Sequence, residues 1–280
     1  MSLRIQPNST SLRTERSVVR SQQELRRSYT RLASGDRLTN AGEDAPAYAQ
    51  SLRLRAEVSA LQEAARGASD GLALTQTAEG ALSQMTELFQ RMRELAMQGG
   101  SGTLRDSDRA RLQAELSQLR DEADRISSTT RFGDQDLLSG GLATGAKFTI
   151  GASGSNDTQT VTLASVRVAT LGTPAAPLTG ASLATQTSAT AALESIDAAL
   201  QSTYDARARM GIAQARFQSA SDAVALAAEG ATSAKGRIRD VDVARETAAL
   251  AQQQIQSQAG IAMLAQANQL PEMALALLRR

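Results

Sequence analysis

Apolar residues recur at helical spacing at both ends of the chain. In residues 9–33, Val18, Leu25 and Leu32 repeat every seven residues, which is the period of a coiled-coil seam. The Gly and Pro residues of segment 34–46 predict that a loop follows this first helix.

A long helix is predicted over residues 47–98, where apolar residues again step by three and four. The clearest seam in this helix comprises Leu82, Met85, Phe89, Met92 and Ala96. The helix also contains Gly67, Gly71 and Gly80. Each glycine costs about 1 kcal/mol relative to Ala, so these residues mark either close helix–helix approaches or the ends of shorter helices. After a glycine-rich break, another helix is predicted over 105–128.

The middle of the chain has a different pattern. Residues 130–180 are rich in Gly, Ser and Thr, and they contain two short runs of strand-forming residues, 147–150 and 160–163. Turn-forming residues separate these runs, which predicts a β-hairpin. The proline-containing segment 170–180 predicts a loop.

Helical spacing returns near residue 188 and continues over several turns, through Leu200, Thr203, Arg207, Met210, Gln214 and Phe217. The glycines at 230 and 236 predict a break, followed by a last helix over 237–268. The seam predicted for that helix is Leu250, Gln254, Ser257, Ile261, Leu264 and Asn268. Polar seam residues cost stability and specify register, so we expect the isolated chain ends to be unfolded and to become ordered in an assembly.

These elements predict a mainly α fold, a long antiparallel helical rod or coiled coil formed by both chain ends, with a small β-hairpin insertion. A thin rod has much surface and little core, and a heterologous contact between copies that does not close builds a helical filament.

Composition argues against an enzyme. The chain has no Cys and no His, and aromatic residues make up only 2% of it. These absences remove thiol nucleophiles, the commonest general base and most transition-metal ligand sets. Neither Lys147 nor Lys235 lies in a glycine-rich phosphate-binding loop. We therefore expect no catalytic site, no cofactor and no metal.

The charged residues favour a structural interpretation as well. The formal net charge is +1, and no apolar run approaches the roughly 20 residues that span a bilayer, so neither nucleic-acid binding nor membrane insertion is expected. The arginine-rich start lacks interleaved aromatics and is better explained as a solvated or intersubunit helix face. Carboxylate pairs could suggest metal ligands, but helix capping explains them better. These pairs are Asp106 with Asp108 and Asp240 with Asp242.

Several segments of the first half resemble one protein family, bacterial flagellin. Residues 31–38, Arg-Leu-Ala-Ser-Gly-Asp-Arg-Leu, resemble its Arg-Leu-Ser-Ser-Gly-x-Arg-Ile segment. Residues 69–82 are similar to its Asn-Asp-Gly…Gln-Thr-x-Glu-Gly-Ala-Leu segment. Residues 90–98, Gln-Arg-Met-Arg-Glu-Leu-Ala-Met-Gln, match its Gln-Arg-x-Arg-Glu-Leu-Ala-x-Gln segment.

The second half resembles the same family in the same order. Residues 237–242, Arg-Ile-Arg-Asp-Val-Asp, resemble its Arg-Ile-Arg-Asp-x-Asp segment, and residues 259–271 are close to its C-terminal signature. The resemblance covers roughly 1–165 and 188–280. The large variable outer domains of longer flagellins are missing, so the chain resembles a short form.

The resemblance implies a subunit that polymerises into an extracellular flagellar filament for swimming. It also implies that residues 1–45 and 237–280 form a terminal coiled-coil domain in the filament interior, and that residues 46–236 form a helical rod with the β-hairpin region at about 130–180. It implies export through the flagellar secretion channel without a cleaved signal, an export chaperone bound by the C-terminal helix, and contacts with filament cap and junction proteins. The assembly seam would be Val18, Leu25, Leu32, Leu250, Ile261 and Leu264. In some bacteria the family also activates Toll-like receptor 5, and the positions that resemble that contact site are Arg91, Leu95 and Glu115. A solvated helix face or a contact between protofilaments is the favoured explanation of Arg91 and Glu115.

Alternatives of other classes remain open. A hook–filament junction protein shares the helical ends, although the C-terminal signature favours the filament subunit. A non-assembling adhesin or receptor ligand would stay monomeric under all conditions. A protease carried in the variable region is disfavoured by the absence of His and by the short insertion.

Overall fold

The computed structural model of the chain describes residues 9–152, 157–173 and 176–278. The chain divides into two units. Unit 1 comprises Met1–Ala56 and Gly230–Arg280, and unit 2 comprises Glu57–Glu229. Each unit therefore has its own contacts and is considered by itself.

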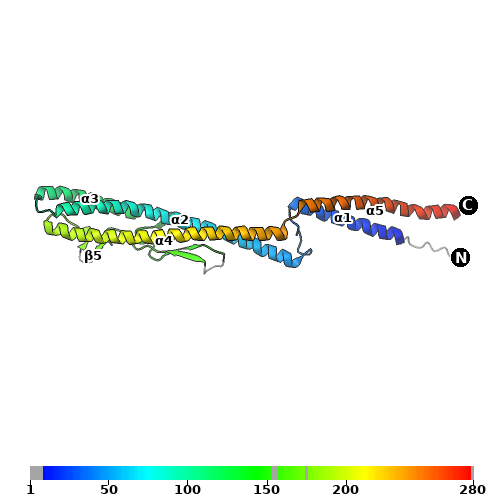
Figure 1. The fold of residues 1–280 in the computed structure, drawn as a ribbon, viewed down its shortest axis with the longest axis horizontal. Helices are drawn as coiled ribbons and strands as arrows, with labels where there is room; N and C mark the ends of the chain where they lie inside the picture. The colour runs from blue at the N-terminus through cyan, green and yellow to red at the C-terminus, as the bar shows by residue number, and fades with distance from the viewer. Residues whose placement is uncertain (1–8, 153–156, 174–175, 279–280) are drawn as a thin grey trace. The chain divides into compact units, whose positions relative to one another are not determined.

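Unit 1 contains an antiparallel pair of helices from opposite ends of the chain (Figure 1). Helix α1 spans Ser9–Ser34 and helix α5 spans Val243–Leu278. Ser11 hydrogen-bonds Asn268 and Ser28 hydrogen-bonds Gln253, so the residue number falls along α5 as it rises along α1. The predicted antiparallel pairing of the two chain ends is thus confirmed.

Unit 2 is built on three long helices. They are α2 (Ala45–Gly99), α3 (Asp106–Thr129) and α4 (Gln186–Arg239). The start of α2 and the end of α4 belong to unit 1. Helices α2 and α4 are antiparallel, since Gln90 contacts Tyr204 while Arg93 contacts Asp197. The turn after α2 sends α3 back along it, with Glu115 beside Arg91.

The predicted seam of α2 forms the centre of the unit 2 core. Leu82, Met85, Phe89 and Met92 are all fully buried. On α4 the buried row is Ala206, Met210, Ala213 and Phe217, whereas the predicted row had Arg207 and Gln214 in place of the two alanines. The small Ala side chains lie on the core face, and the longer polar side chains flank it, because a polar head can reach solvent from a flanking position.

Helix α2 runs through Gly67, Gly71 and Gly80, and two of these three glycines are sites of close approach. A Cβ on Gly71 would collide with the ring of Phe217, and a Cβ on Gly67 would collide with the Thr149 carbonyl. The Phe217 ring also packs edge-on against Phe148, with 5.4 Å between ring centroids. The glycines therefore let α4 and the β-hairpin approach the α2 backbone. Gly80 meets nothing within 4 Å.

In the described part of the chain, the β structure consists of three antiparallel pairs of strands. β3 (Ala146–Thr149) pairs with β4 (Thr158–Val161), which confirms the predicted hairpin. β1 (Arg131–Phe132) pairs with β2 (Gln135–Asp136), and β5 (Gly172–Thr173) pairs with β6 (Ala176–Pro177) before a 3-10 turn, Leu178–Gly180. Segment 170–180, predicted as a loop, therefore contains β5, β6 and that turn. Strands of two residues carry no alternating pattern that a sequence could reveal.

The predicted break at residues 230–236 is wrong, because α4 continues through both glycines to Arg239. A Cβ on Gly236 would lie 2.8 Å from a carboxylate oxygen of Asp240, so this glycine provides space for the residue that follows the helix. The last helix starts at Val243 rather than at 237. At this start, the Asp242 carboxylate accepts a hydrogen bond from the Arg245 amide at 3.1 Å. Side-chain capping thus sets the start of α5.

Candidate assembly surfaces

The facing surfaces of α1 and α5 form a narrow seam that is largely polar. The inward positions of α1 follow three-four spacing: Ser11, Thr14, Val18, Ser21, Leu25, Ser28 and Leu32. Those of α5 follow the same spacing: Glu246, Leu250, Gln253, Ser257, Gly260, Leu264 and Ala267. Most of them are only half-buried. Since hydrophobic burial dominates helix pairing, this seam stabilises the pair weakly.

Polar contacts and one close approach fix the register of the pair. The Gln254 side-chain amide donates a hydrogen bond to the Tyr29 hydroxyl at 2.9 Å. Gly260 lies opposite Val18, and a Cβ on Gly260 would lie 2.7 Å from a Val18 methyl carbon. Val18 therefore fits against a position that tolerates no side chain, and a slip of the register would remove that fit.

The outer surface of α1 and α5 exposes large apolar side chains. They are Leu12, Val19, Tyr29, Val243, Ile255, Ile261 and Met263. The side chain of Ile255, on α5, is 67% exposed. Scattered exposed apolar residues are ordinary, but these exposed residues are at least as numerous as the apolar residues of the seam. The surface therefore has the composition of an interface rather than of a solvated helix pair.

A set of polar contacts, here called the clasp, joins the segment after α1 to the junction between α4 and α5. The Arg239 guanidinium donates to the Asp36 carboxylate at 2.6 Å, and the Arg37 guanidinium donates to the Ile238 carbonyl at 2.9 Å. The Arg37 amide also donates to the Arg239 carbonyl at 2.6 Å. Hydrogen bonding from Arg239 lowers the pKa of Asp36, against an opposing effect of burial. Both ends of the chain thus share one hydrogen-bonded joint.

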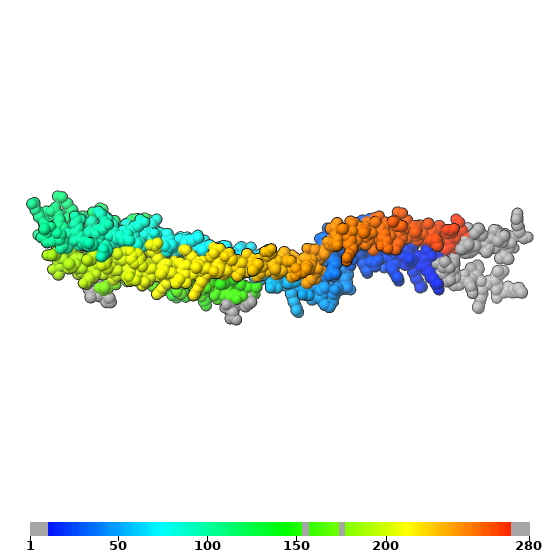
Figure 2. Space-filling model, viewed as in Figure 1, coloured from blue at the N-terminus to red at the C-terminus, as the bar shows by residue number. Residues whose placement is uncertain are grey.

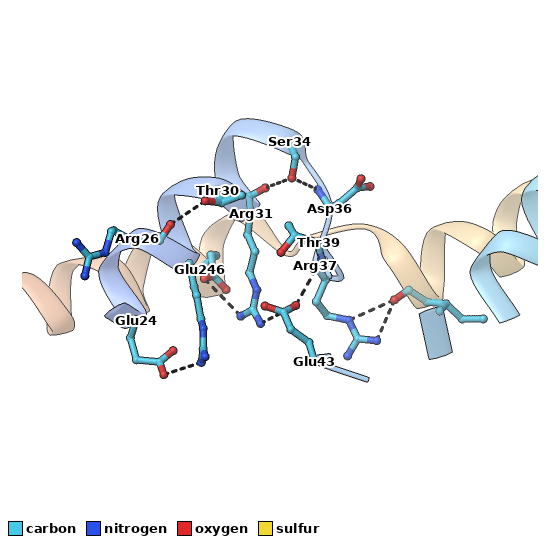
Figure 3. A network of polar contacts seen from close by, with 12 residues as sticks. Glu24, Arg26, Thr30, Arg31, Ser34, Asp36, Arg37, Thr39, Glu43 and Glu246 are labelled. Carbon is cyan, nitrogen blue, oxygen red and sulfur yellow. Dashed lines mark hydrogen bonds and ion pairs between the residues drawn. The ribbon is translucent and has the colours of Figure 1, made fainter. Parts of the chain in front are cut away.

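Arg31 extends this joint to α1 (Figure 3). Its guanidinium lies 3.4 Å from the Glu43 carboxylate and 3.8 Å from the Glu246 carboxylate. Glu43 also accepts a hydrogen bond from the Thr39 amide at 3.4 Å. Arg31 therefore links α1, the loop that follows it and the first turn of α5.

The predicted assembly residues lie in two different environments. Val18, Leu25, Leu32, Leu250 and Leu264 are half-buried between α1 and α5 of the same chain. Ile261 is 54% exposed on the outer surface of α5, since Gly260 occupies the inward position beside it. The structure therefore brings five of these residues together within the chain and leaves Ile261 accessible. Their role in assembly stays a prediction.

Arg91 and Glu115 meet on the surface of unit 2. The Arg91 guanidinium donates to one Glu115 carboxylate oxygen at 2.8 and 3.0 Å, and to Glu94 at 2.9 Å. The hydrogen bond to Glu115, followed by that to Glu94, raises the pKa of Arg91. Leu95 is buried in the core beneath this surface, because it lies on the inward row of α2. Its side chain is therefore separate from the face that Arg91 and Glu115 present.

Sequence reasoning assigned no role to the clasp or to Arg109. Arg109 is buried at the turn between α2 and α3, where its guanidinium donates to the carbonyls of Gly99 and Ser101. A cation at a helix C-terminus stabilises the free carbonyls there, and a basic residue just beyond the break was the available signal. For the clasp, the motifs at 31–38 and 237–242 identified the segments but not their contact.

The carboxylate pairs considered as metal ligands lie at helix starts. Asp242 caps α5, and Asp106 and Asp108 lie in the first turn of α3, whose N-cap is Arg105. Within the part of the chain that the structure describes, no three acidic residues gather as a metal site would require. Across the same residues, no helix has the length and apolar character needed to cross a bilayer.

Comparison with known proteins identifies two family regions. Residues 5–143 match the bacterial flagellin N-terminal helical region, and residues 193–278 match the bacterial flagellin C-terminal helical region. Together they include α1, α2, α3 and nearly all of α4 and α5.

Similar full-length proteins have matching sizes. A flagellar filament core protein of Brachyspira hyodysenteriae is 34% identical over 98% of this chain and 99% of its own length. A flagellin of Bacillus subtilis is 34% identical over 99% of this chain and 100% of its own length. Among solved structures, a flagellar hook-associated protein of Vibrio parahaemolyticus covers 71% of this chain with a TM-score of 0.59 and 17% identity, which shows a shared fold alone.

Proposed function

Since this chain belongs to the bacterial flagellin family, and is a non-enzymatic subunit of the extracellular flagellar filament, we propose that the outer surface of α1 and α5 packs against neighbouring copies. The observation that carries the proposal is the set of exposed apolar side chains on a helix pair with a weak seam. Ile255, Ile261 and Met263 supply that surface on α5, and Leu12 and Val19 supply it on α1.

Burial by neighbours explains how such a pair becomes stable. Fully burying an exposed Ile, Leu or Met side chain stabilises a protein or an assembly by about 1.5–3 kcal/mol. Burial of several such side chains therefore contributes more stability than the polar seam positions cost. The pair inside one subunit then supplies register, through Gly260 and the polar contacts, while neighbouring copies supply most of the apolar burial. We expect Val18, Leu25, Leu32, Leu250 and Leu264 to support assembly by holding that geometry.

Each region of the chain would also have its own place in the filament. Residues 1–45 and 237–280 would line the interior, where apolar side chains are shielded from solvent. Residues 46–236 would form the rod outside it. Support comes from the exposed apolar side chains on the outer surface of α1 and α5, together with the well-filled core of unit 2.

Partners before and during assembly would use the same surfaces. An export chaperone would cover the exposed apolar side chains of α5 and so keep chains from polymerising too early. Filament cap and junction proteins would contact the subunits at the two ends of the filament. Toll-like receptor 5 would contact the face of Arg91 and Glu115, with Leu95 supporting it from below. A contact between protofilaments would use that same face, so receptor binding requires a free subunit.

Negative-stain electron microscopy of seeded assembly tests the central proposal. The variant Ile255→Gln/Ile261→Gln should keep the helix content of the parent in circular dichroism and form few or no filaments. The matched control is Leu226→Gln, which removes a 72% exposed side chain from α4 in unit 2 and should assemble like the parent. A chain lacking residues 237–280 should form no filaments. Assembly of the double variant at the parental rate would refute the proposed packing surface.

A further inference from the structure

A row of three residues on α4 has no partner among the residues that the structure describes. Arg209, Ile212 and Arg216 follow three-four spacing, and each is exposed. Ile212 is 57% exposed. Among the described residues, neither Arg209 nor Arg216 pairs with a carboxylate or forms a hydrogen bond with another side chain. The row borders a groove of about 170 Å³ against β4, lined by Gln159 and Thr160 of the strand and by Thr162 just after it.

The electrostatic setting makes these arginines unusual. Unit 2 has an excess of acidic residues, twenty against fourteen basic ones, so carboxylates are available as partners. Arg207, on the same helix, pairs with Glu79 at 2.8 Å, and Arg93 of α2 pairs with Asp197 at 2.6 Å. Figure 2 shows α4 and the green β-hairpin side by side along one face, with α4 accessible over its length. Two exposed cations around an apolar side chain form a surface that suits an acidic partner.

An acidic surface of matching spacing lies on α2 and α3. Glu87 and Glu94 are exposed and one heptad apart on α2, as Arg209 and Arg216 are on α4. Each pair therefore separates its charges by about 10 Å along the helix axis. Glu115 adds a third carboxylate, and Arg91 is the only cation it and Glu94 contact among the described residues. No cation of the described residues pairs with Glu87.

We propose that the Arg209–Ile212–Arg216 row of one copy docks on the Glu87–Glu94–Glu115 face of a neighbouring copy in the filament. The proposal rests on assembly of the chain into a filament, and it assigns two complementary surfaces of the rod to one contact. The surfaces lie on different helices, so the contact is heterologous. Every subunit can use both at once, which propagates an open polymer rather than closing a dimer. Ile212 would pack on the aliphatic stem of Arg91, whose charge Glu115 and Glu94 already neutralise.

Charge reversal with complementation tests this contact. The variants are Arg209→Glu/Arg216→Glu and Glu87→Arg/Glu94→Arg, each checked for parental helix content and thermal unfolding. Each variant alone should raise the critical concentration for seeded assembly by at least about tenfold, because like charges then face each other. An equimolar mixture of the two should assemble again, since each reversed surface then has an opposite partner on the other variant. Lys147→Glu reverses an exposed charge outside both surfaces and should assemble like the parent.

Three results would overturn the proposal. They are parental assembly by either variant alone, failure of the mixture to recover, and equal loss of assembly in the Lys147→Glu control. Failure of the underlying filament proposal is distinguishable, because the parent protein itself would then form no filaments under seeded conditions.

Discussion

Arg239 holds Asp36 across a sequence separation of 203 residues, with 2.6 Å between the guanidinium nitrogen and the carboxylate oxygen. The pair joins the residue after α1's closing turn to the last residue of α4. Gly35, at φ +74°, makes that turn, and its carbonyl accepts a hydrogen bond from the Val241 amide at 3.0 Å. The clasp therefore sets where α5 begins relative to α1, before any contact along the seam.

Low pH should weaken the clasp. The pKa of Asp36 lies below its ordinary value of 3.8, chiefly through the hydrogen bond from Arg239. A lowered folded-state pKa stabilises the clasp fully above the unfolded value and loses that effect as pH falls through the folded value. The clasp should therefore weaken as the pH falls through and below the ordinary value of 3.8.

Amide exchange in segment 35–43 and the first turn of α5 measures this loss. Asp36→Asn should show the acid-loosened exchange already at pH 7 and little further change down to pH 3. Glu24→Gln is the control, since Glu24 pairs with Arg27 in an exposed pair outside the clasp. Parental pH dependence in the Asp36→Asn variant would show that another group controls the joint.

The second prediction concerns the glycines of α2. Gly71→Ala should destabilise unit 2 by about 1–3 kcal/mol, because the new Cβ collides with the rigid Phe217 ring in a packed core. Gly80→Ala should stabilise it by up to about 1 kcal/mol, since its Cβ meets nothing and Ala favours the helix. Thermal unfolding followed by circular dichroism compares the two. A neutral or stabilising effect of Gly71→Ala would contradict the close approach at Gly71.

The third prediction concerns Arg109. Arg109→Met should destabilise unit 2 by about 2 kcal/mol, because the carbonyls of Gly99 and Ser101 lose a charged donor in a buried place. Arg111→Met should change stability by less than about 0.5 kcal/mol, since the Arg111 side chain is 84% exposed. Chemical denaturation of the two variants is the measurement. An equal effect of both would remove the special role of Arg109.

Periodicity predicted what depends on many residues at once. The helices and the Leu82–Met92 seam follow from a repeated burial pattern that no single residue decides. Single-residue signals misled, because glycine at 230 and 236 reads as a break although the cost of each is small against a long helix. Two positions of the predicted row on α4 were wrong by one residue for a related reason. Ala206 and Ala213 are apolar but small, so the larger Arg207 and Gln214 dominated the pattern.

The surfaces were harder to predict than the core. The exposure of Ile261 depends on Gly260 taking the inward position, and that choice depends on Val18, which is more than 240 residues away. The clasp needs both chain ends in place before its partners can be known. A helical pattern reveals which residues share a face, whereas pairing between distant faces comes only from the folded chain.

The last prediction tests the register of the chain ends. Gly260→Ala places a Cβ 2.7 Å from a Val18 methyl carbon, so α1 and α5 must separate or slip. We expect faster amide exchange along both helices and slower seeded filament growth, by about tenfold for 1.4 kcal/mol of strain. Val18→Ala alone should cost about 0.5–1.5 kcal/mol through lost burial at a half-exposed site.

The double variant Val18→Ala/Gly260→Ala should recover part of the loss, because removing the methyl groups makes room for the new Cβ. A coupling energy of about 0.5–3 kcal/mol in this cycle is the range for residues in direct contact. Gly211→Ala, whose Cβ meets nothing within 4 Å on α4, controls for the change in helix propensity. Strictly additive effects of Val18→Ala and Gly260→Ala would mean that the two residues do not set the register together, and the clasp alone would then have to align the helices.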